Sequence, residues 1–218
     1  RYNFFYDNCT TRARDIIEEC IEGKVVYPDG KEGLSFRDIV HQYTKGHEWD
    51  ELGIDMCLGS EADEPIDVRK QMFAPFYMFE AAGRATIVTG DNVRPFVLQE
   101  KKVVDVEPEG GEGGFPLSPL MCVCVLMAAV CFVGWFQLKI KKVIWIWDLF
   151  LFGIQGVAGC IIAFLVCFSI HPTVDSNWLI LLLNPIPLIY LPVMAYKAIK
   201  GKKDLYHTIN IVYLTLFI

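Results

Sequence analysis

The chain's 218 residues are 53% hydrophobic and carry a net charge of −6, but the charge is spread unevenly. Residues 1–115 hold 13 basic and 23 acidic side chains, whereas residues 116–218 hold 7 and 3. The acidic first half argues against nucleic acid as a partner, because nucleic-acid binding needs a basic surface. We therefore expect an acidic water-soluble part followed by an apolar membrane part.

The soluble part opens with an aromatic, β-prone run at residues 2–6, which predicts a strand. A helix is expected next, with Asn8 or Thr10 as its cap and Gly23 at its end. Its apolar side chains recur at helical spacing, with charged residues on the other face. These apolar residues are Ala13, Ile16, Ile17, Cys20 and Ile21.

Both helices and strands are predicted in the rest of the soluble part, up to residue 106. They are a helix at 35–43 capped by Ser35, a helical or irregular stretch at 49–58, a helix at 66–83 interrupted near Pro75, and a hairpin of strands 85–89 and 95–98 around a turn at 90–92. Residues 107–116 are rich in Gly and Glu and predict a flexible linker.

Four apolar stretches predict transmembrane helices, because about 20 apolar residues cross a bilayer. They lie at about 117–138, 147–170, 178–196 and 208–218, and the last is still apolar where the sequence stops. The sequence also lacks an initiator Met. We therefore expect an α-helical polytopic membrane domain, in a chain that is truncated at both ends.

Lysines in the loops predict the orientation. Three follow the first stretch and four follow the third, whereas residues 171–177 contain neither Lys nor Arg. The positive-inside rule places the lysine loops in the cytoplasm. This topology predicts a multi-pass protein of a bacterial inner membrane, with the soluble domain in the periplasm.

The eight cysteines do not predict a disulfide scaffold. Five lie in the apolar stretches, where a small polarizable residue is ordinary, and Cys9, Cys20 and Cys57 lie in the soluble part. One bridge among these three, for example between Cys20 and Cys57, is left open. The spacing motifs of metal and phosphate sites are absent from the sequence, so neither a metal nor a cofactor is predicted.

Cys9 is the strongest candidate for chemistry in the sequence. It lies at the expected start of a helix, where free backbone N–H groups and the helix dipole favour a thiolate. Asn8 and Thr10 are polar neighbours and Arg12 adds positive charge. These features favour a nucleophile over a buried structural cysteine.

A thiol nucleophile normally needs an imidazole base. His41 and His47 are the histidines of the soluble part, and each is better explained as an ordinary surface or loop residue. We therefore expect the base in a segment that precedes Arg1.

Two polar sites in the membrane part are candidates for contact with lipid. Residues 171–177, with His171 and Asn177, form either an interfacial turn or a surface for lipid headgroups. Asn184 stands before two prolines in an apolar stretch, which predicts a kink. The carbonyls that the prolines leave without a helical N–H must find partners inside the protein. The kink either lines a lipid-accessible groove or serves simple helix packing.

Residues 2–12, with the sequence YNFFYDNCTTR, resemble the Lnb N-terminal periplasmic domain family of Bacteroidota membrane proteins. Residues 53–59 and 71–75 support this resemblance, which extends to the His-Pro and Asn-Pro pairs at 171 and 184. The resemblance implies an α+β papain-like fold of permuted NlpC type, here a fragment, followed by the membrane domain. In that permuted order the catalytic histidine precedes the cysteine.

The resemblance also implies an activity, which is lipoprotein N-acylation. Cys9 would be the nucleophile, a membrane phospholipid the acyl donor and the amine of a lipoprotein N-terminus the acceptor. Asn8, Thr10 and Arg12 would support the thiol or an oxyanion. A cysteine amidase or peptidase of the cell envelope and a non-catalytic envelope assembly module are the alternatives.

Overall fold

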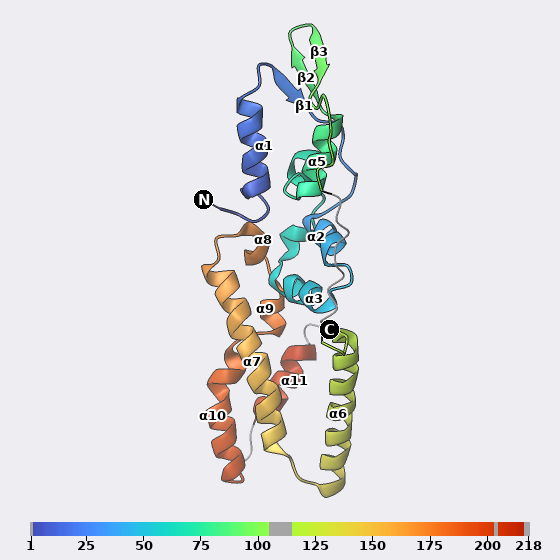
Figure 1. Cartoon of the computed structure of the whole chain (residues 1–218). Coiled ribbons are helices and arrows are strands. Elements are labelled where there is room, and N and C mark those ends of the chain that lie inside the picture. Colours follow the sequence, from blue (N-terminus) through green and yellow to red (C-terminus); the bar gives the residue numbers. More distant parts are fainter. Residues whose placement is uncertain (1, 105–114, 203–204, 216–218) are drawn as a thin grey trace. The chain divides into compact units, whose positions relative to one another are not determined.

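A computed structural model describes residues 2–104, 115–202 and 205–215, which form two compact units (Figure 1). Unit 1 comprises residues 1–47 and 61–115, and unit 2 comprises residues 48–60 and 116–218. In unit 1 the elements are α1 (Cys9–Glu19), β1 (Lys24–Val26), α2 (Phe36–Thr44), α4 (Val68–Gln71), α5 (Pro75–Arg84), β2 (Thr86–Thr89) and β3 (Asn92–Pro95). A 3-10 turn, η1 (Ser60–Asp63), lies where the chain passes from unit 2 back to unit 1.

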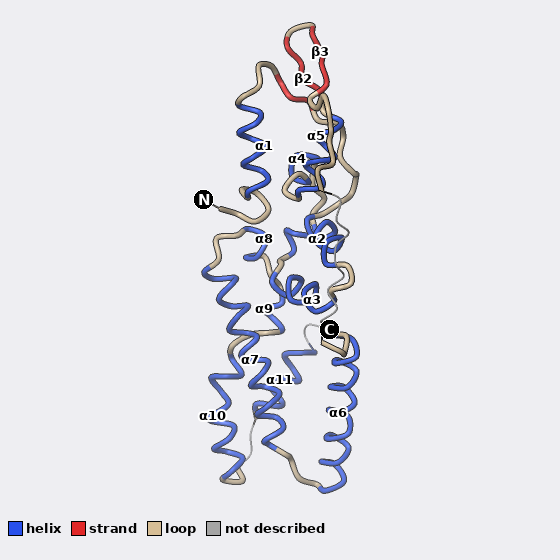
Figure 2. The backbone as a smooth tube through the Cα atoms, viewed as in Figure 1, coloured by secondary structure: helices blue, strands red, loops and turns tan. Residues whose placement is uncertain are grey.

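Unit 2 is helical, as Figure 2 shows by the colour of its trace. Its helices are α3 (Glu48–Cys57), α6 (Pro119–Ile140), α7 (Trp145–Phe168), α8 (Pro172–Asp175), α9 (Leu179–Leu182), α10 (Ile186–Ile199) and α11 (Tyr206–Thr215). The sequence division placed residues 48–60 with the soluble part, whereas in the structure they group with the membrane helices. Most of the expected linker lies outside the described residues.

The strand expected at residues 2–6 is wrong. Asn3 and Asp7 form an isolated antiparallel bridge around a tight turn. The Asn3 Oδ1 accepts hydrogen bonds from the backbone N–H groups of Phe5 and Tyr6, at 3.2 and 3.3 Å. A side chain that bonds to nearby backbone in this way competes with a strand ladder, and the turn leads directly into α1.

Helix α1 differs from its expected form at its end and on its faces. It ends at Glu19, with Cys20 as its C-cap, and does not continue to Gly23. The helix buries Arg14, whereas Ile16 is 61% exposed. Arg14 is buried because it donates a hydrogen bond to the backbone carbonyl of Arg69 and pairs with Asp15.

The core of unit 1 is an aromatic cluster of Phe5, Phe36 and Phe73. Their ring centroids are 4.5 to 5.3 Å apart, the range in which aromatic pairs attract each other. Ile39 and Met72 are also fully buried in unit 1. The helix expected at 66–83 is divided into α4 and α5, and Pro75 begins α5, where its missing N–H costs nothing.

Three antiparallel strands form the sheet, in the order β1-β2-β3. The hairpin is confirmed, although its second strand begins at Asn92 because the turn takes only Gly90 and Asp91. Strand β1, which the sequence did not predict, pairs Val25 with Ile87. Unit 1 is thus mixed helix and strand, as expected, while the papain-like arrangement remains a prediction.

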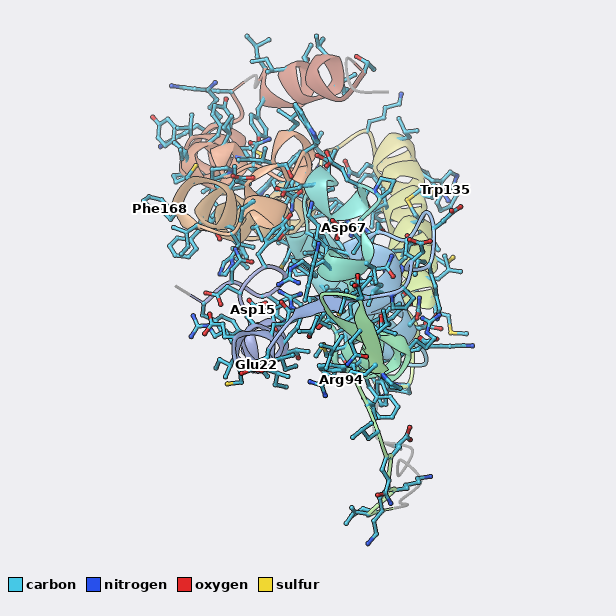
Figure 3. The ribbon with its side chains drawn as sticks, turned by 90° about the horizontal axis from the view of Figure 1, so that it is seen from above. Asp15, Glu22, Asp67, Arg94, Trp135 and Phe168 are labelled. Carbon is cyan, nitrogen blue, oxygen red and sulfur yellow. The ribbon has the colours of Figure 1, made fainter. Side chains whose placement is uncertain are left out.

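Three segments of unit 2 are long and apolar enough to cross a membrane: 119–140, 145–168 and 172–199. They match the first three expected stretches, and α11 overlaps the fourth. Trp135 on α6 and Phe168 at the end of α7 point away from the ribbons, and they are 56% and 75% exposed (Figure 3). Apolar side chains directed outward are what a lipid environment requires.

Helices α7 and α10 pack closely through small residues. A Cβ added at Gly159 would overlap the backbone of Asn184, and one at Gly156 would overlap Leu188. Small residues allow membrane helices to approach in this way. The third span is interrupted between α9 and α10, where the Gln155 side chain donates to the Leu182 carbonyl at 3.0 Å.

Candidate active site

Asn8 caps α1 and connects it to the rest of unit 1. Its Oδ1 accepts from the N–H groups of Thr10 and Thr11, both at 2.9 Å. Its Nδ2 donates to the carbonyls of Phe4 and Phe73, also at 2.9 Å. The side chain is buried and fully bonded, so it fixes where the first turn of α1 begins.

Thr11 completes the cap, which the sequence reasoning missed. Its Oγ1 accepts from the Asn8 N–H at 2.9 Å, so the two residues form a reciprocal capping box. The usual sequence signature of such a box has Glu or Gln at this third helical position. The threonine at this position does not match that signature, so the sequence did not indicate the capping box.

Cys9 occupies the first position of α1, directly after the cap, and is exposed. In the described structure its backbone N–H has no acceptor, since the cap takes up the N–H groups of Thr10 and Thr11 and that of Arg12 bonds to the Asn8 carbonyl. An accessible thiol therefore stands on the same residue as a free backbone donor. This pairing is the arrangement that an acyl-transfer nucleophile with an oxyanion donor needs.

Two of the sequence segments behind the resemblance meet at this site. The bond from Asn8 to the Phe73 carbonyl joins residues 2–12 to residues 71–75. Gln71 anchors the second segment, because its buried amide donates to the carbonyls of Lys31 and Ile66. The core therefore holds the capped start of α1 in place.

Arg12 forms an exposed ion pair with Asp7, with N–O distances of 2.6 and 2.8 Å. The hydrogen bond from Arg12 and its charge lower the pKa of Asp7 to about 2. Near neutral pH the pair carries no net charge. The negative charge of Asp7 therefore offsets most of the effect that the charge of Arg12 would have on the Cys9 thiol.

The histidines and cysteines do not complete the site within the described residues. His41 is half-buried on α2 and His47 is exposed, and no hydrogen bond joins either of them to Cys9. All eight cysteines, including Cys20 and Cys57, are free thiols. The part of the chain that the structure describes contains no cluster of three or more His, Cys, Asp or Glu that could hold a metal ion.

The polar residues expected to face lipid lie in unit 2. Asn177 does not face lipid: it is 4% exposed, donates to the Met56 carbonyl at 2.8 Å and accepts from the Leu179 N–H at 2.9 Å. Asn184 is half-buried, and its side-chain oxygen accepts from the N–H of Ile186, the first residue of α10. His171 is half-buried at the start of α8.

Comparison with known families bears on the membrane part. Residues 111–218 match the Lnb transmembrane domain. This Lnb match supports the family that the sequence resembles, and it agrees with the apolar helices of unit 2. No curated protein and no solved structure matches the chain significantly.

Proposed function

We propose that the chain is part of an Lnb-type membrane acyltransferase in which Cys9 carries the acyl group. The observation that carries the proposal is the exposed Cys9 thiol beside its own free N–H, in a chain whose membrane part matches the Lnb transmembrane domain. The chain passes between the units at residues 47–48, 60–61 and 115–116, so unit 1 is tethered to a membrane domain. Phospholipids are the acyl esters of that environment.

The reaction has two steps that share one thioester. The Cys9 thiolate attacks an ester carbonyl of a phospholipid, a C–S bond forms and the C–O bond breaks. The departing alkoxide takes up the proton that the thiol lost, which leaves a lysophospholipid. The amine of a lipoprotein N-terminus then attacks the thioester, a C–N bond forms, the C–S bond breaks, and the amine's proton returns to the thiolate.

The Cys9 N–H would stabilise the oxyanion in both tetrahedral intermediates. A single preorganised donor of this kind is worth roughly 100-fold to 1000-fold in rate. Asn8 acts by positioning, since its cap fixes the direction of that N–H. The inner membrane, with unit 1 on the periplasmic side, is the location that the lysine loops favour.

Cys9→Ser in the complete protein tests the proposal, with Cys20→Ser as the matched control. Cys20 is also an exposed thiol, at the opposite end of α1. We expect mass spectrometry of lipoprotein N-termini to show the added acyl chain with the wild type and with Cys20→Ser, and to show none with Cys9→Ser. Full acylation with Cys9→Ser would overturn the proposal.

A strain that lacks the gene separates the proposal from its main alternative. If lipoprotein N-termini keep their acyl chain in that strain, the acyltransferase assignment fails, which favours a cysteine hydrolase or a non-catalytic assembly module instead. Loss of the acyl chain supports transfer.

A further inference from the structure

Helix α3 is attached at both of its ends to one end of the membrane bundle. Near its start, the Trp49 indole N–H donates to the Leu117 carbonyl at 2.8 Å, two residues before α6 begins. Near its end, the Met56 carbonyl accepts from the Asn177 side chain at 2.8 Å. The Gly59 N–H donates to the Thr173 carbonyl at 2.6 Å.

These two attachment points lie on the same side of the membrane. The first lies where α6 begins, and the second lies between the end of α7 and the start of α9. The chain crosses twice between them, once in α6 and once in α7. Within unit 2, Figure 1 shows α3 at this end of the helices. A helix attached to the ends of membrane spans lies at the level of the lipid headgroups.

The packing at Gly59 shows that this attachment is close. A Cβ added there would overlap the Ser176 side chain and the backbone of Ser176 and Asn177. Thr173 and Asn177 are 1% and 4% exposed beneath the segment. The chain after α3 is therefore packed directly on the turn that joins two spans.

Two stripes of different character run along α3. Trp49, Leu52 and Met56 recur at helical spacing and form one apolar stripe, while Glu48, Glu51 and Asp55 form another stripe that is acidic. The protein buries none of the α3 residues, and Trp49 and Leu52 are 40% and 38% exposed. Tryptophan is enriched at headgroup level, where its ring lies in an apolar layer and its N–H finds an acceptor.

We propose that α3 is an interfacial helix, whose stripe of Trp49, Leu52 and Met56 contacts membrane lipid while its acidic stripe faces water. The α3 helix would be about 15 Å long and too short to be stable alone. Attachment at both ends and lipid against the apolar stripe account for its stability.

Site-specific photocrosslinking of the full chain in phospholipid nanodiscs tests this proposal. The photoreactive residue p-benzoylphenylalanine replaces Leu52 in one variant and Glu51 in another. Glu51 lies about 160° around the helix from Trp49. The same residue in place of Val125, which is 62% exposed on α6, reports crosslinking to lipid chains. Mass spectrometry then measures lipid adducts.

We expect a lipid adduct at position 52 that exceeds the one at position 51 several-fold and approaches the one at position 125. Equal yields at 51 and 52, or crosslinks from 52 to the protein alone, would overturn the proposal. The measurement is made in the Cys9→Ser background, so it does not depend on the proposed acyl transfer.

A matched pair of glycine variants tests the attachment itself. Gly59→Ala introduces the overlap described above, whereas Gly53→Ala, within α3, meets nothing within 4 Å. We expect Gly59→Ala to lower lipid crosslinking from position 52 several-fold and Gly53→Ala to leave it unchanged. Loss in both variants, or in neither, would show that the Gly59 contact does not hold α3 at the lipid surface.

Discussion

At the scale of single residues, the site depends on Asn8 as much as on Cys9. The Asn8 side chain makes four hydrogen bonds, two as an acceptor at the helix start and two as a donor to carbonyls of Phe4 and Phe73. The sequence predicted the cap, because Asn before a helical pattern is a common start signal. It did not predict the bond to Phe73, which joins residues far apart in the chain.

Asn8→Ala is expected to loosen the start of α1. Loss of the cap and of the buried bonds should lower the local free energy of unfolding by about 1–3 kcal/mol. Asn8→Asp keeps the cap acceptor but lacks the Nδ2 donors, so it should lie between alanine and wild type. Hydrogen exchange of peptides from α1 measures both, with Asn92→Ala on the exposed strand β3 as the control. Equal protection in Asn8→Ala and Asn92→Ala would contradict this role.

At the scale of elements, local signals predicted helices better than strands or faces. Helix α2 forms after Ser35, as expected, because Ser35 and Asp38 cap each other. Strand β1 has only three residues and its pairing with β2 is non-local, so no sequence period marks it. The α1 face could not be predicted either, because Arg14 is buried through a carbonyl and carboxylates that the fold brings to it.

An ion-pair network joins α1 to α4. Glu18 accepts two hydrogen bonds from Arg69, both at 3.0 Å, and one from the Tyr27 hydroxyl at 2.8 Å. Burial acts to raise the pKa of Glu18, but these bonds and the nearby positive charges outweigh burial and lower it below the ordinary value of 4.5. The contribution of Glu18 to stability is therefore full above pH 4.5 and is lost as the pH falls through the lowered pKa.

Glu18→Gln should remove this pH dependence. We expect it to lower the free energy of opening of α1 by about 1–2 kcal/mol near neutral pH, and to match wild type at low pH, where Glu18 is protonated. Hydrogen exchange across a pH series measures this, with the exposed Glu19→Gln as the control. A constant difference between Glu18→Gln and wild type at every pH would exclude the charge as its cause.

At the scale of the whole molecule, the sequence located the membrane part, and the structure groups residues 48–60, which the sequence division placed in the soluble part, with the membrane helices. Hydropathy predicts the spans because lipid demands long apolar helices, whatever their packing partners. Four acidic residues in this segment, all within α3, made it resemble soluble sequence. The apolar stripe on the same helix is not visible in a count of charges. Hydrogen bonds of residues 48–60 with residue 117 and with residues 173–177 join the segment to unit 2.

The packing of α7 on α10 gives a prediction for the membrane unit. Gly159→Ala places a methyl group into the backbone of Asn184 and should destabilise the unit by about 1–3 kcal/mol. Gly134→Ala on α6 meets nothing within 4 Å and should be neutral or slightly stabilising. Thermal unfolding in detergent, followed by size exclusion, compares them. Equal unfolding midpoints for the two variants would show that the close packing of α7 on α10 at Gly159 does not contribute to stability.

The interrupted third span has a consequence for how the protein enters a bilayer. At its break, the Leu182 carbonyl accepts its hydrogen bond from a side chain of another helix, Gln155 of α7. Inserted alone, the third span would bring that carbonyl into hydrocarbon without this partner, at a cost of several kcal/mol. The third span is therefore no independent insertion unit, and α7 must already be in the bilayer, or enter together with it, for the broken helix to settle there.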